Sequence, residues 1–304
     1  MTSAPGRPPD VPARDRVPAP ALFLLSGLTL YLGAAIAVDL FPVLGAPTVA
    51  WLRIVVAAVV LVAWRRPWRS RWSRRDLLAV AGFGTVLAAM NVTFYVAIDH
   101  LPLGTAVAME FLGPIAVATL TGRGWRERVG IALAAVGVVL LAGVTLDAGG
   151  GPDVVVGLVA VLAAAACWAA YILLGRRVAL GESGVTSLSL AMVAGGLVFA
   201  PFLVGSAGPV VTDGRVALAV LAVALLSSVV PYVIDQVVLR RVSSATFALL
   251  QAMLPATAAV IGALVLRQLP TPLEVLGLVA VSGAIALTSF TRGTPAPAPV
   301  ADPG

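Results

Sequence analysis

Long apolar segments, separated by short stretches rich in arginine, glycine and proline, limit most strongly what this chain can fold into. A helix rises about 1.5 Å per residue, so roughly 20 apolar residues cross the ~30 Å hydrocarbon core of a bilayer. Ten segments are long enough: residues 19–38, 46–64, 76–98, 103–121, 129–146, 154–175, 184–204, 216–239, 243–266 and 273–290. Only 11% of the residues are charged, against about 25% in soluble proteins. The sequence therefore predicts an all-α membrane protein with ten transmembrane helices.

The arginines indicate how these helices are oriented. All 20 basic residues are arginine, and seventeen of them fall on the side that holds the N-terminus if the segments alternate in direction. Arg215 and Arg267 fall on the opposite side, and Arg53 lies inside the second segment. Because cytoplasmic loops carry the excess of basic residues, we expect both termini to be cytoplasmic. The tails, residues 1–18 and 291–304, are rich in proline and alanine, and we expect them to be disordered.

Several classes of protein are poorly supported. A nucleic-acid-binding protein would carry its basic residues on one face of a soluble fold, whereas these arginines lie between apolar segments. A single cysteine, Cys167, excludes an internal disulfide, and a single histidine, His100, excludes a histidine-cluster metal site. The connections are also too short to contain a soluble catalytic domain. We therefore expect a function carried out within the membrane, without a metal or a cofactor.

The two halves of the chain show weak similarity to one another. Glu110 and Pro114 in the first half align with Gln251 and Pro255 in the second half. Each half has five segments, and an odd number forces the second copy to enter the membrane in the opposite direction. We expect two inverted five-helix repeats, residues 19–147 and 153–290, an arrangement typical of secondary transporters with a binding site at the repeat interface.

Proline lies within the fourth, eighth and ninth predicted helices. A proline has no N–H, so the carbonyl group one turn earlier loses its helical partner. Pro114 and Pro255 leave the carbonyl groups of Glu110 and Gln251 without a partner, and Pro231 lies in the eighth segment. These breaks make a polar site at membrane depth possible, although bending of helices for packing would also explain them.

Three charged residues lie inside apolar segments, where each costs roughly 2.5–3.5 kcal/mol at the bilayer centre. Glu110 is a candidate proton carrier or contact for a substrate amine, and a structural ion pair with Arg53 is the alternative. Arg53 would bind a substrate carboxylate or neutralise Glu110. Asp235 belongs to the same site or lies in the solvated interface near Arg240. The sequence leaves these alternatives open.

Uncharged polar and aromatic side chains in the same segments complete the predicted site. They offer hydrogen-bonding and aromatic surface to a small polar solute, although each would also serve as a packing contact between helices. These residues are Asn91, Tyr95, Trp168, Tyr171, Tyr232 and Gln251.

Five short segments carry a resemblance to a known family: residues 40–47, 90–91, 102–114, 166–172 and 231–232. With the ten helices as five plus five, they resemble the EamA-type proteins of the drug/metabolite transporter superfamily, and among these the bacterial inner-membrane threonine/homoserine exporters. The resemblance covers about residues 20–290 and is most specific between Glu110 and Pro114. It implies that Arg53, Asn91, Glu110 and Asp235 fall where those exporters carry arginine, asparagine, glutamate and an acidic residue.

The predicted function is therefore secondary active export of small amino acids or related metabolites across the bacterial cytoplasmic membrane. The expected partners are a small-molecule substrate, protons and the lipid bilayer, and a monomer is compatible with the sequence. A multidrug exporter of the same superfamily is the main alternative. A membrane-embedded enzyme is less well supported, because the apolar segments contain no pairing of a nucleophile with a base.

Overall fold

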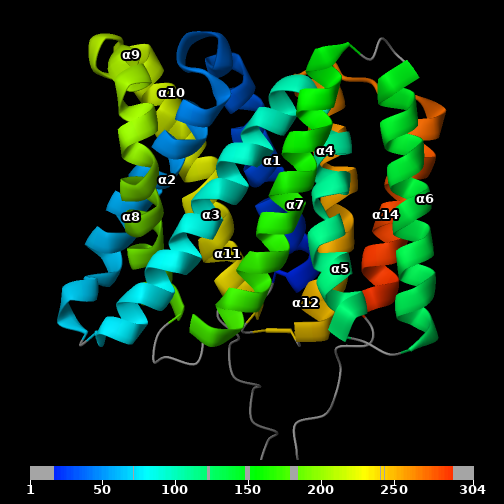
Figure 1. Cartoon of the computed structure of the whole chain (residues 1–304), viewed down its shortest axis with the longest axis horizontal. Helices are drawn as coiled ribbons and strands as arrows, with labels where there is room; N and C mark the ends of the chain where they lie inside the picture. The colour runs from blue at the N-terminus through cyan, green and yellow to red at the C-terminus, as the bar shows by residue number, and fades with distance from the viewer. Residues whose placement is uncertain are drawn as a thin grey trace, which may run out of the picture.

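The computed structural model describes residues 17–70, 72–121, 124–147, 151–178, 184–239, 241–242 and 244–289. Long helices run side by side and form one bundle (Figure 1). The predicted disordered tails fall almost entirely outside the described residues.

The first five predicted membrane segments correspond to six helices, because the fourth segment is split in two. They are α1 (Ala19–Leu44), α2 (Ala46–Arg65), α3 (Arg74–His100), α4 (Leu103–Glu110), α5 (Leu112–Thr121) and α6 (Trp125–Asp147), with the 3₁₀ turn η2 (Pro67–Arg69) after α2. The tight connection between α1 and α2 depends on Gly45, whose φ of 75° is unfavourable for residues with a Cβ atom.

The second half of the chain has more interruptions. It contains α7 (Pro152–Val178), α8 (Gly184–Leu203), η3 (Val204–Ala207), α9 (Gly208–Thr212), α10 (Gly214–Ala224), η4 (Leu225–Val229), α11 (Val230–Leu239), α12 (Ser244–Leu250), η5 (Gln251–Met253), α13 (Leu254–Val265) and α14 (Pro272–Ser289). Of these, η3 and η5 are 3₁₀ turns, and η4 is a π-helical segment that joins α10 to α11.

The prediction of an all-α membrane protein is confirmed. Within the described residues, 9 helical segments are long and apolar enough to cross a membrane, and a shorter apolar helix, Gln251–Val265, continues α12 to form the tenth. Large apolar side chains remain exposed along these helices, such as Leu78 at 75% and Val139 at 70%. Because exposed apolar surface on this scale is unfavourable in water, we assign it to the lipid-facing exterior.

Small residues allow the helices to approach closely. A Cβ atom on Gly84 of α3 would collide with the backbone of Ala191 of α8, and one on Gly195 would collide with the backbone of Gly84. Trp51 of α2 also reaches α8, where its Nε1 atom donates a hydrogen bond of 2.8 Å to the carbonyl oxygen of Gly196. Close backbone contact compensates for the weak driving force between apolar helices in lipid.

Candidate functional site

The guanidinium group of Arg53 lies where α2, α3 and η4 meet. Its Nη1 atom donates hydrogen bonds to the hydroxyl oxygens of Tyr95, at 3.1 Å, and Ser227, at 3.3 Å. The guanidinium carbon lies 4.8 Å from the centroid of the Tyr95 ring, within the range of a cation–π contact. Arg53 is 9% exposed, and its Nε–H has no hydrogen-bond partner in the described part of the chain. Because an unsatisfied buried donor is costly, this N–H is suited to bind an anion.

The π-helical segment η4 explains how Ser227 reaches Arg53. A π-helical turn contains an additional residue, which changes the direction of the side chains that follow. Ser227 is 4% exposed and also donates a hydrogen bond to the carbonyl oxygen of Val223. Gly33 of α1 permits the close approach of η4, because a Cβ atom there would lie 2.8 Å from the Cβ atom of Ser227. Pro231 follows one turn later and cannot donate to the carbonyl group of Ser227.

Glu110 ends α4 and is followed by a turn at Phe111 that separates α4 from α5. Pro114 lies in the first turn of α5. The charge of Glu110 acts on Arg53, but within the described residues no ion pair within 4.0 Å and no hydrogen bond joins Glu110 to another side chain. The direct ion pair that we considered from the sequence is therefore not formed in this structure. Arg53 is held instead by Tyr95 and Ser227.

Asp235 of α11 contacts the first half of the chain through Ser26 of α1. The Ser26 hydroxyl donates a hydrogen bond of 2.8 Å to Oδ1 of Asp235 and lies 3.4 Å from the carbonyl oxygen of Pro231. Ser26 is 3% exposed, and Asp235 is partly buried. The structure therefore places Asp235 against the interior of the bundle rather than in a fully solvated interface.

Ser26 and Ser227 were not predicted from the sequence as members of this region, and neither was Tyr31. Tyr31 lies near the midpoint of the 26-residue helix α1 and is 5% exposed. Its phenol group interacts electrostatically with both Glu110 and Asp235, so it lies near both acidic side chains. In the sequence, Tyr31 is distinguished only as the single tyrosine of its predicted segment, five residues after Ser26. We call Arg53, Tyr95, Ser227, Glu110, Tyr31, Ser26 and Asp235 the polar core.

The remaining predicted site residues lie outside the hydrogen bonds of the polar core. Asn91 is buried, and its Nδ2 atom donates to the carbonyl oxygen of Leu87 in its own helix at 2.7 Å. Gln251 begins the 3₁₀ turn η5, four residues before the buried Pro255 of α13. The break at η5 thus lies at the position in the second half that aligns with the break after α4.

The three other aromatic candidates pack against apolar neighbours. Trp168 contacts Phe111 with ring centroids 4.7 Å apart, so it lies beside the break that follows Glu110. Tyr171 stacks on Phe83 at 4.6 Å. Tyr232 packs against the same apolar cluster as Tyr171, which contains Leu61, Val80, Phe83, Leu87, Leu188 and Ala191.

Comparison with known proteins supports an assignment to a family. Residues 155–290 match the model of the EamA-like transporter family. The chain is 36% identical over 267 residues to the threonine/homoserine exporter RhtA of Escherichia coli (strain K12), covering 86% of this chain and 88% of the relative. It is 35% identical over 266 residues to threonine/homoserine exporter RhtA of Salmonella typhimurium (strain LT2), covering 87% and 89%.

A solved crystal structure shares the fold. Its TM-score is 0.57 with 20% sequence identity, and the match covers 88% of this chain and 96% of the solved chain. At this identity the likeness concerns the fold alone. The sequence matches give the closer relationship, and the chain belongs to the EamA-like transporter family of the drug/metabolite transporter superfamily.

Proposed function

We propose that this protein exports threonine, homoserine or similar small amino acids across the bacterial cytoplasmic membrane. The observation that carries the proposal is the arrangement of Arg53 and Glu110: a guanidinium group and a carboxyl group inside the bundle that no ion pair joins within the described residues. An amino acid is a zwitterion, and its recognition requires both signs of charge. The relatives named as threonine/homoserine exporters support the same substrate class.

The chemistry of Arg53 suits a carboxylate. A guanidinium group presents five donors in a planar fork, and the two hydrogen bonds to Tyr95 and Ser227 both use Nη1. The Nε–H and Nη2 donors therefore remain for a bidentate contact with the substrate carboxylate. The substrate ammonium group would then contact Glu110 or Asp235.

We further propose that residues 19–147 and 153–290 are inverted repeats that rock about the polar core. The contacts between helices support this. Helix α3 packs against α7 and α8, while α1 packs against α11 and α13. Helix α2 packs against α8 and α10, α4 against α13, α5 against α7, and α6 against α14. The five membrane segments of the first half correspond in order to the five of the second half. When each segment is exchanged for its counterpart, every contact in this set becomes another contact of the set, as a twofold axis in the membrane plane requires.

Proton coupling is the third part of the proposal. Tyr31 interacts electrostatically with both Glu110 and Asp235, so a carboxyl group from each half of the chain is available near it to bind a proton or a substrate ammonium group. Protonation of Glu110 would remove its attraction for the ammonium group, and loss of the substrate on the outer side would follow. The excess of arginine on one face supports cytoplasmic termini.

The experiment is efflux of labelled threonine, homoserine and a panel of other amino acids and cationic drugs from proteoliposomes with an imposed pH gradient. We expect wild-type protein to export threonine and homoserine. Glu110→Gln, which preserves the shape of the side chain, should abolish the dependence on the pH gradient. Efflux of the drugs alone would favour the multidrug alternative. Unchanged, gradient-dependent efflux by Glu110→Gln would remove the coupling role.

A further inference from the structure

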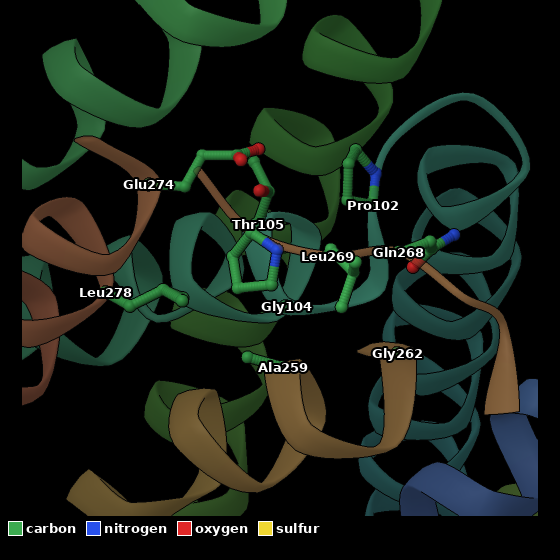
Figure 2. A pocket seen from close by; sticks show the side chains of 10 residues that line it. Pro102, Gly104, Thr105, Ala259, Gly262, Gln268, Leu269, Glu274 and Leu278 are labelled. Atoms are coloured by element: carbon green, nitrogen blue, oxygen red, sulfur yellow. The ribbon is translucent and has the colours of Figure 1, made fainter. Parts of the chain in front are cut away.

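A cavity of about 160 Å³ lies apart from the polar core, where the first turns of α4 and α14 meet α13 (Figure 2). It is on the face of the bundle opposite to the arginine-rich connections. Its lining comes from both halves of the chain. The residues are Pro102, Gly104, Thr105, Ala259, Gly262, Gln268, Leu269, Pro270, Glu274 and Leu278.

Two buried polar side chains line this cavity. Thr105 is 3% exposed, and its hydroxyl group has no hydrogen-bond partner in the described part of the chain. Glu274 is 8% exposed, and its Oε2 atom accepts a hydrogen bond of 2.7 Å from the backbone N–H of Thr271. In Figure 2 the side chains of Glu274 and Thr105 approach one another. A buried threonine hydroxyl without a partner beside a carboxylate indicates a site that a ligand completes.

The amino end of α4 supplies the opposite polarity. Pro102 at its N-cap makes no side-chain cap hydrogen bond, and the Leu103 N–H donates to Oε1 of Gln268 at 2.9 Å. The N–H groups of Gly104 and Thr105 belong to the same first turn, where helix geometry provides no partner. Such N–H groups, together with the helix dipole, favour an anion. The cavity thus has an anion-binding end at α4 and a cation-binding end at Glu274.

We propose that this cavity is a second amino-acid site, which receives the substrate on its way out of the protein. The substrate carboxylate binds the N–H groups of Gly104 and Thr105, the ammonium group binds Glu274, and the Thr105 hydroxyl bonds to either. The volume is about ten times the 10–15 Å³ that one water needs, which is sufficient for a small amino acid. This inference rests on the proposed function and on the orientation that the arginines predict.

The test is the number of threonine molecules bound by the purified protein in lipid nanodiscs, measured with radiolabelled threonine. We expect two sites in the wild type, and one in either Arg53→Gln or Glu274→Gln. Glutamine also serves as a helix-capping residue, so Glu274→Gln removes the charge and keeps the cap. Loss of a charge-assisted contact should weaken the outer site by at least about tenfold. The matched control is Glu127→Gln, which removes a buried carboxylate from the first turn of α6 and should retain both sites.

The outcomes separate the two proposals. If the wild type binds a single threonine, and Arg53→Gln abolishes this binding while Glu274→Gln does not, the proposal of a second site is wrong and the proposal of amino-acid export stands. A wild-type protein that neither binds nor exports threonine would overturn the proposed function itself.

A second measurement does not depend on the folding of Glu274→Gln. The chain has a single cysteine, Cys167, so Leu278→Cys in a Cys167→Ala background places one thiol in the wall of the cavity and leaves the proposed binding groups unchanged. In intact cells, a membrane-impermeant thiol reagent should label this cysteine, and external threonine should slow the labelling severalfold. The same protection is expected when Arg53→Gln is added to the variant. Labelling that threonine does not slow would overturn the proposal.

Discussion

Tyr95→Phe tests how the charges of the polar core are kept apart. The substitution removes the hydroxyl group that accepts a hydrogen bond of 3.1 Å from Arg53 and retains the ring that lies 4.8 Å from the guanidinium carbon. Because Tyr95 is fully buried, water cannot take the place of the lost hydroxyl. Arg53 then keeps its hydrogen bond to Ser227 and the ring contact, and it is freer to turn toward Glu110.

The expected magnitude follows from the hydrogen bond that is lost. A hydrogen bond to a charged group contributes about 1.5–3 kcal/mol, and about 1.4 kcal/mol corresponds to a factor of ten in affinity. The bond to Ser227 and the ring contact remain, so we expect the lower part of this range: roughly tenfold weaker threonine binding and roughly tenfold lower kcat/KM for efflux. An Arg53–Glu110 ion pair would offset part of the lost stability, so we expect Tm to fall by less than about 5 °C.

The assay is threonine efflux from proteoliposomes, with equilibrium binding and thermal unfolding of the same preparation. Tyr171→Phe is the matched control, because the Tyr171 ring stacks on Phe83 at 4.6 Å and its hydroxyl is not bonded to Arg53. It should transport at the wild-type rate. If Tyr95→Phe binds and exports threonine within twofold of the wild type, the hydroxyl of Tyr95 does not position Arg53 and our reasoning is wrong.

Three further predictions concern packing, coupling and gating. Gly84→Val should prevent folding, because its Cβ would collide with the backbone of Ala191; the measurement is loss of the monodisperse peak in size-exclusion chromatography. Gly82→Val is the control and should elute normally, because no atom lies within 4 Å of its Cβ position. Asp235→Asn should retain threonine exchange and lose proton-driven efflux if Asp235 carries the proton, and equal loss of both would assign it to substrate binding instead. Gln268→Ala removes the 2.9 Å hydrogen bond that joins the second half to the amino end of α4. The cavity should then open more often, so that Leu278→Cys in the Cys167→Ala background reacts several times faster with an impermeant thiol reagent; an unchanged rate would contradict this gating role.

Most of the fold followed from the sequence because lipid imposes a simple length requirement on each segment. Helix α1 extends to Leu44, six residues beyond the predicted end at residue 38, because Asp39 does not interrupt the helix and lies exposed near its end. The breaks after Glu110 and at Gln251 occur one turn before Pro114 and Pro255, as the missing N–H of proline requires.

The partners within the polar core could not be predicted in the same way. Regular α-helical spacing would place Ser228 on the same face as Tyr232 and Asp235. The π-helical segment η4 adds a residue to the turn, and it is Ser227 that bonds to Arg53. Backbone hydrogen bonding decides between an α-helical and a π-helical turn, and neither form has a distinct residue pattern here.

The polar core also explains why a buried arginine need not be neutralised by the nearest carboxylate. A direct Arg53–Glu110 pair would satisfy both charges and leave nothing for a zwitterion, since a ligand would first have to break it. Hydrogen bonds from Arg53 to two neutral hydroxyl groups stabilise the guanidinium group without cancelling its charge. In this structure the Arg53 guanidinium group and the Glu110 carboxyl group therefore stay unpaired with one another, and under the proposed function a molecule carrying both signs of charge would bind between them.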